Sequence, residues 1–103
     1  MLEKIKKISK QIHDELEDAE KYIKCALKLK DEDKDLADIY YWLSQEEMAH
    51  ADKLHRSVVD QIDLYRKTTG EPPSDMMALY EYVHNQEIED AKEVKLMWAM
   101  YKS

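Results

Sequence analysis

Apolar residues recur at steps of three and four along three stretches of the chain, which is the spacing of one face of an α-helix. This periodicity predicts helices over residues 2–29, 35–68 and 75–101. The apolar positions of the first stretch are Ile5, Ile8, Ile12, Leu16, Ala19, Tyr22, Ile23, Ala26 and Leu27. Those of the second stretch are Leu36, Ile39, Tyr40, Leu43, Leu54, Val58, Ile62 and Tyr65. Those of the third stretch are Met76, Leu79, Tyr80, Val83, Ala91, Val94 and Trp98.

Helix-breaking residues are confined to the predicted connections. Acidic residues 31–33 separate the first two helices, and Gly70, Pro72 and Pro73 end the second. Glycine favours the left-handed conformation that follows many helices, and proline cannot continue a helix. Connections this short predict that the three long helices pack antiparallel, in one all-α domain spanning residues 1–103. Charged residues make up 38% of the chain, which is typical of helical bundles.

The net charge and the lengths of the apolar runs argue against several classes of protein. A formal net charge of −7 argues against a general nucleic-acid-binding protein, which would carry a basic face. No apolar run approaches the length of a membrane span, and the lysine-rich N-terminus lacks the apolar segment of a signal peptide. Cys25 is the only cysteine, so no internal disulfide can form. We therefore expect a protein of the cytoplasm, or of the interior of a protein compartment, without nucleic-acid or membrane partners.

Ionisable residues interrupt the middle of each apolar stripe. They are Glu15 in the first helix, Glu47 and His50 in the second, and His84 and Glu87 in the third. In three antiparallel helices these positions lie near one level, and carboxylates that face inward there repel each other unless a positive charge lies among them. A divalent or trivalent cation is the simplest such charge. Carboxylate and imidazole ligands without thiolate suit iron, manganese or zinc.

The spacing within the second helix also favours metal binding. Residues three apart on a helix share a face, so Glu47 and His50 can reach one ion, whereas Glu46 is expected to face outward. Tyr22 lies seven residues after Glu15, about two helical turns along the same face. Its hydroxyl could hydrogen-bond a metal-bound carboxylate, and an ordinary core tyrosine is an equal alternative.

Two segments resemble the ferritin-like superfamily, in particular its rubrerythrin-type and encapsulated ferritin-type chains. Residues 15–22, which read Glu-Leu-Glu-Asp-Ala-Glu-Lys-Tyr, are similar to the family's first-helix Glu with a Tyr seven residues later. Residues 44–51, which read Ser-Gln-Glu-Glu-Met-Ala-His-Ala, are similar to its second-helix Glu-Glu-x-x-His. Residues 85–91 echo the first of these segments. The resemblance covers residues 10–60 best.

The resemblance implies a di-iron site that oxidises Fe(II) as a ferroxidase does, with Glu15, Glu47 and His50 as ligands. The third helix would complete the ligand set through either Glu87 or His84. The family's fourth helix is absent, so by analogy two chains would form the site at a subunit interface, in a homo-oligomer. The encapsulated relatives imply a further partner, an enclosing shell protein.

A helical oligomerisation or adaptor module without metal is the alternative function. Its ionisable residues would be solvated, paired with lysines or hydrogen-bonded in the core. Residues 40–42, Tyr-Tyr-Trp, favour an interface in either case, because three consecutive aromatic side chains span most of a helix and one must face away from the core. The sequence leaves two equal alternatives for Trp98 and Tyr101: they add to that surface, or they are large core residues with one edge exposed. The two other histidines, His13 and His55, are expected on the surface.

Overall fold

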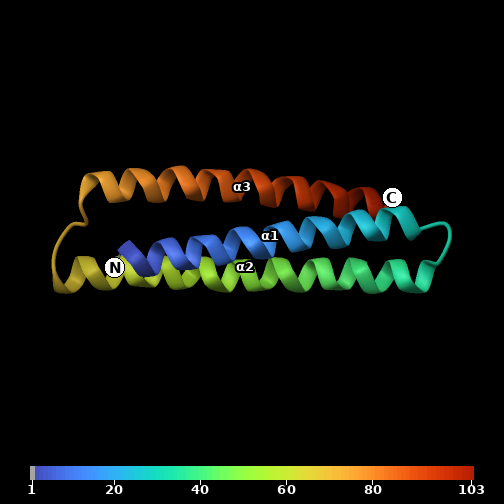
Figure 1. The fold of residues 1–103 in the computed structure, drawn as a ribbon, viewed down its shortest axis with the longest axis horizontal. Coiled ribbons are helices and arrows are strands. Elements are labelled where there is room, and N and C mark those ends of the chain that lie inside the picture. Colours follow the sequence, from blue (N-terminus) through green and yellow to red (C-terminus); the bar gives the residue numbers. More distant parts are fainter. Residues whose placement is uncertain (1) are drawn as a thin grey trace.

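Three long helices make up the fold. The computed structural model describes residues 2–103, in which α1 spans Leu2–Leu29, α2 spans Lys34–Thr68 and α3 spans Ser74–Lys102, with no strand. Figure 1 shows that the helices alternate in direction and that α1 lies between α2 and α3. The molecule is a rod of 56 × 19 × 18 Å. The predicted three-helix, antiparallel fold is confirmed, and the predicted helix ends lie within one residue of those observed.

The short connections end the helices through identifiable hydrogen bonds. The Asp33 carboxylate accepts a hydrogen bond of 3.1 Å from the Leu36 amide, which caps the first turn of α2. At the other end of α2, Gly70 adopts a φ of 115° and its amide donates to the Tyr65 carbonyl. Only glycine adopts this left-handed conformation without strain, and Pro72 and Pro73 then prevent further helix. No helix within residues 2–103 has both the length and the apolar character needed to cross a membrane.

The core lies along α1. This helix packs extensively on α2 and less extensively on α3, whereas α2 and α3 have few direct contacts with each other. Most of the predicted apolar stripe of α1 is buried. Its buried members are Ile5, Ile12, Leu16, Ala19, Ile23 and Ala26. The central position of α1 therefore follows from its strong amphipathic pattern, since it must cover two neighbouring helices.

The buried face of α2 agrees with the prediction in its second half, where Val58 and Ile62 are buried, and differs from it near the start of the helix. Leu36 and Ile39 are 38% and 50% exposed, whereas Ala37 and Ser44 are fully buried. Small side chains let the two helix backbones approach closely, so the interface follows them rather than the larger leucine and isoleucine. Among the three consecutive aromatic residues, Trp42 faces away from the core and is 57% exposed, as the sequence predicts.

The C-terminal turn of α3 is packed more tightly than the sequence suggests. Tyr101 is 5% exposed, so of the two alternatives for this residue the structure shows the core position and not the external surface. Its ring stacks on Tyr41, and its hydroxyl donates a hydrogen bond to the Asp38 carboxylate. Trp98 is half-buried. These contacts fix the end of α3 against the beginning of α2.

A chain of hydrogen bonds joins the three helices at Ser44. The Trp98 indole nitrogen donates to the Ser44 hydroxyl at 2.8 Å, and that hydroxyl donates to the Ala19 carbonyl at 2.7 Å. Trp98 lies on α3, Ser44 on α2 and Ala19 on α1. Because Ser44 is fully buried, its hydroxyl has no water to replace these partners.

Replacing Ser44 by alanine should lower the free energy of unfolding by about 1–2 kcal/mol, because the Trp98 indole N–H loses its acceptor inside the protein. Ser57→Ala, a half-buried position on the same helix, controls for the change in helix propensity. Urea unfolding followed by circular dichroism measures both. An equal effect of the two substitutions would show that the Ser44 hydrogen bonds contribute nothing.

Candidate metal centre

Glu15, Glu47 and His50 come together between α1 and α2. The His50 Nδ1 atom lies 3.5 Å from Glu15 Oε2 and 3.9 Å from Glu47 Oε1. One donor atom from each of the three side chains lies within 4.8 Å of the others. The structure thus brings together the three residues that the sequence proposes as the main ligands, although the distances are those of a loose set without an ion.

This first set lies at the edge of the helix interface rather than at its centre. Each of the three residues directly precedes a buried apolar one, namely Leu16, Met48 and Ala51. One residue corresponds to about 100° of rotation on a helix. The three donor side chains therefore lie beside the row of buried apolar side chains on each helix, and not within it. The Glu15 and Glu47 side chains are 27% and 19% exposed, and His50 is 52% exposed. The sequence predicts three inward-facing residues, and the structure shows two half-buried carboxylates with an exposed imidazole.

The two carboxylates of the first set interact unfavourably when both are charged. The adjacent Glu15 carboxyl raises the pKa of Glu47 to about 7, because it accepts a hydrogen bond from the protonated form, and burial adds to the shift. The nearby His50 opposes this shift. The Glu15 Oε2 atom is buried and has no hydrogen-bond partner. A proton or a cation between the carboxylates would reduce their repulsion and would give the buried Glu15 oxygen a partner.

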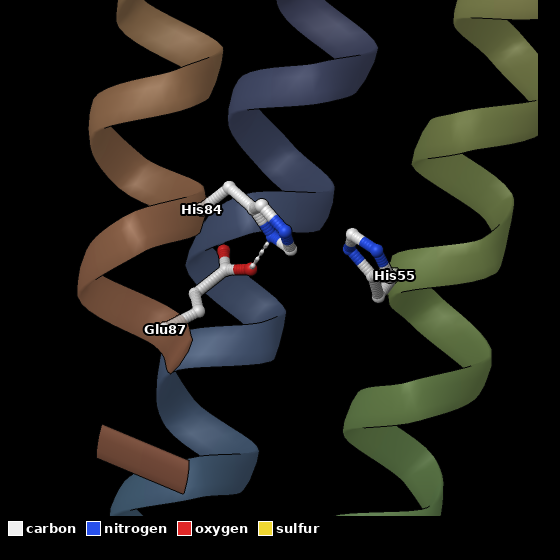
Figure 2. Close-up of side chains that lie close together, drawn as sticks. All are labelled: His55, His84 and Glu87. Atoms are coloured by element: carbon white, nitrogen blue, oxygen red, sulfur yellow. Dashed lines mark ion pairs between the residues drawn. The ribbon is translucent and has the colours of Figure 1, made fainter. Parts of the chain in front are cut away.

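A second set consists of His55 on α2 with His84 and Glu87 on α3 (Figure 2). The His84 Nδ1 atom lies 3.8 Å from Glu87 Oε2. The His55 and His84 rings stack with centroids 4.5 Å apart and planes inclined by 9°. His55 is half-buried, so its predicted place on the surface is wrong. Its position was detectable, because it lies four residues after buried Ala51 and three before buried Val58.

Burial shifts the pKa values of two residues of the second set, Glu87 and His55. Desolvation raises the pKa of Glu87 to about 7, with a smaller contribution from the Asp90 charge. Desolvation also lowers the pKa of His55, and repulsion from His84 lowers it further, while Asp52 opposes the shift. The His84 Nδ1 atom is buried without a hydrogen-bond partner. Neutral imidazole is the form that binds metal ions.

The sequence predicts that Glu87 or His84 completes the set of Glu15, Glu47 and His50 at a single level, whereas the donor atoms of residues 2–103 form two separate sets. The reason lies on α2, where His50 and His55 are five residues apart. That separation turns the helix by about 140°, so the two histidines face different neighbours. Glu87 and His84 therefore join His55 rather than the Glu47–His50 pair.

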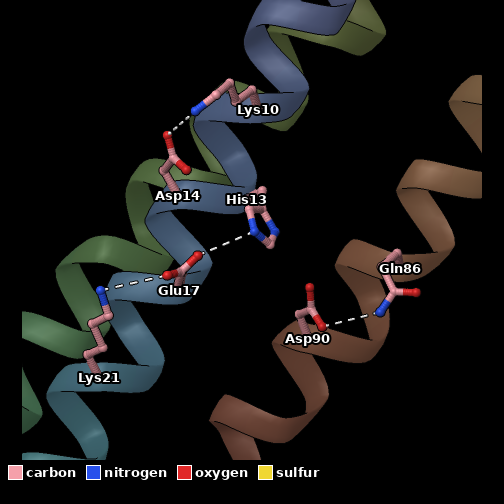
Figure 3. Close-up of polar contacts among 7 residues, drawn as sticks. All are labelled: Lys10, His13, Asp14, Glu17, Lys21, Gln86 and Asp90. Atoms are coloured by element: carbon pink, nitrogen blue, oxygen red, sulfur yellow. Dashed lines mark hydrogen bonds and ion pairs between the residues drawn. The ribbon is translucent and has the colours of Figure 1, made fainter.

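The remaining candidate residues lie outside both sets. Tyr22 stacks on Tyr40 with ring centroids 6.0 Å apart, a contact that the core-tyrosine interpretation accounts for. Glu46 is half-buried rather than outward-facing. His13 lies on the exposed face of α1, as the sequence predicts, and its imidazole is 3.3 Å from the Glu17 carboxylate (Figure 3).

Both sets contain ligands suited to a divalent ion. The first offers two carboxylates and one imidazole, and the second offers two imidazoles and one carboxylate. Oxygen-rich sets suit iron and manganese, and a larger share of imidazole suits zinc as well as iron. Comparisons of the chain with models of known families, with curated proteins and with solved structures found no match.

Proposed function

We propose that this protein binds iron through Glu15, Glu47 and His50. The observation that carries this proposal is the convergence of the three donor groups from two helices, with a buried Glu15 oxygen that lacks a hydrogen-bond partner. Structural side chains at such a position are normally paired, and a bound cation would relieve the Glu15–Glu47 repulsion without protonation of Glu47. Manganese and zinc are the competing ions for this ligand set.

A second copy of the chain is part of the proposal. Two copies of the first set supply four carboxylates and two histidines, the number that the ferritin-like resemblance associates with a di-iron site. The exposed side of the set supports this arrangement, because His50 is 52% exposed and is accessible to another chain. Exposed Trp42, eight residues earlier on α2, provides apolar surface for such an interface.

Iron bound at this site would support oxidation of Fe(II) to Fe(III), with dioxygen or peroxide as the electron acceptor. The contribution of the chain is to hold the ions. Two carboxylates per chain supply negative charge that favours Fe(III) as well as Fe(II), and the His50 nitrogen provides a neutral ligand. An enclosing protein shell is the partner that the resemblance to encapsulated ferritin-type chains suggests.

The test is binding of Fe(II) to purified protein, with wild type compared with Glu47→Gln. We expect saturable binding to wild type under anaerobic conditions, followed by Fe(III) absorption on exposure to air, and loss of the tight-binding phase assigned to the first set in Glu47→Gln. Glu46→Gln is the matched control, since it makes the same chemical change one residue away. Equal binding of iron by wild type and Glu47→Gln would refute the proposal. Light scattering with and without iron then measures the proposed dimer.

A non-catalytic oligomerisation module is the second candidate, and the exposed apolar residues of α2 favour it. Leu36, Ile39 and Trp42 are all more than one-third exposed, which is unusual for large apolar side chains on one helix. If this function is correct, the chain self-associates without metal and Trp42→Ala dissociates it. Glu47→Gln would then leave association unchanged.

A further inference from the structure

His55, His84 and Glu87 border an open cavity of about 310 Å³. Figure 2 shows the His55 ring on α2 facing His84 and Glu87 on α3. One donor atom of each lies within 4.8 Å of the others. The cavity is large enough for an ion together with the water molecules that complete its coordination.

These three side chains form few hydrogen bonds or ion pairs with the rest of the protein. The His84 Nδ1 atom is buried and forms no hydrogen bond, which costs free energy unless an unseen partner is present. The Glu87 side chain is 13% exposed, and its Oε2 atom lies 3.8 Å from the His84 Nδ1 atom. Since α2 and α3 pack on α1 and have few direct contacts with each other, this cluster is one of the few places where the outer helices meet.

We propose that His55, His84 and Glu87 form a second metal site, which binds a divalent transition-metal ion of the zinc class and links α2 to α3. Two imidazoles and one carboxylate are a recurrent ligand set for Zn²⁺, with remaining positions filled by water. The His55 and His84 rings are stacked nearly parallel, so at least one imidazole must rotate out of the stack before both nitrogens can lie at the Zn–N distance of about 2.0–2.1 Å from one ion. This site shares no residue with the first set and goes beyond the proposed iron binding.

The other charged groups of the cavity are compatible with a cation. Asp52, Lys92 and Lys95 also line it. The Lys92 ammonium is 3.4 Å from the Glu89 carboxylate, which reduces its repulsion of a bound ion. Asp52 adds negative charge on the His55 side. The remaining residues that line the cavity are apolar.

Titration with Co²⁺ tests the proposal, because its visible absorption reports nitrogen and oxygen ligands and Zn²⁺ can then displace it. The experiment uses the full-length Glu47→Gln protein, in which the first set is impaired. We expect one Co²⁺ per chain, and loss of the absorption band when His55→Gln is added. His13→Gln is the matched control, since His13 is an exposed histidine paired with a glutamate, and it should leave the band unchanged.

Three results would overturn the second site. They are absence of the band in Glu47→Gln, persistence of the band after His55→Gln, and equal loss with His13→Gln. Circular dichroism of the apo proteins checks that each variant is helical, and His84→Gln replaces His55→Gln if the latter fails to fold. The outcomes for the two sites are separable, since failure of the iron site shows as equal iron binding by wild type and Glu47→Gln, whatever Co²⁺ does.

Discussion

Replacement of Ile23 by alanine is expected to lower the free energy of unfolding by about 3 kcal/mol, within the usual range of about 2–5 kcal/mol for a buried aliphatic side chain. Ile23 is fully buried and is among the largest such side chains in the protein. It lies on α1, which contacts both other helices. The substitution therefore removes apolar contacts and leaves a cavity in the core along α1, where both other helices pack.

The matched control for Ile23→Ala is Leu64→Ala. Leu64 is 57% exposed on α2, and its truncation should change the free energy of unfolding by about 0.5 kcal/mol or less. Urea denaturation at a single protein concentration, in the presence of a chelator, measures both variants. A small effect of Ile23→Ala, or a similar effect of the two, would contradict the placement of the core along α1.

Glu87→Gln is expected to stabilise the metal-free protein at pH 8, by about 2 kcal/mol. Burial raises the pKa of the Glu87 carboxyl from 4.5 to about 7 in the folded protein. As the pH rises from 4.5 to 7, the unfolded chain loses this proton while the folded protein retains it, so stability falls. Above pH 7 the Glu87 carboxyl is charged in the folded protein, and the destabilisation caused by its burial is fully present. Residual contact with solvent makes this destabilisation smaller than the pKa shift alone would give.

At pH 4.5 the same substitution should have little effect, because the folded protein already holds Glu87 in its neutral form. Glu89→Gln provides the control, since the Glu89 side chain is 67% exposed and its charge is solvated at either pH. Thermal or urea unfolding in the presence of a chelator gives the two differences. Destabilisation by Glu87→Gln at pH 8 would show that the Glu87 carboxylate forms favourable contacts that outweigh its burial.

The sequence predicts the helices well because the signals that define them are local. The apolar stripe of α1 and the breakers at Gly70, Pro72 and Pro73 depend on residues within one or two turns. The buried face at the start of α2 could not be predicted in the same way. It depends on how closely α1 approaches, and small residues such as Ala37 and Ser44 carry little weight in a hydrophobic pattern.

The sequence identifies most of the residues of the two candidate sites, but it does not predict which of these residues lie together. The spacing of Glu47 and His50 identifies a pair on one face, and Glu15 does join it. Which neighbour Glu87 meets depends on the rotation of α3 about its own axis, and the weak amphipathic pattern of that helix leaves this rotation undetermined. The pairing of His55 with His84 has no local signal in the sequence, because the two residues are 29 positions apart.

The central position of α1 has a consequence for how the molecule opens. The contacts of α3 are mainly with α1 and are fewer than those between α1 and α2, and its buried residues are only Met76, Val94 and Tyr101. Regions with few buried apolar contacts unfold at lower free energy than the rest of a protein. We therefore expect α3 to undock from the α1–α2 hairpin at a lower free energy than the hairpin itself needs to unfold.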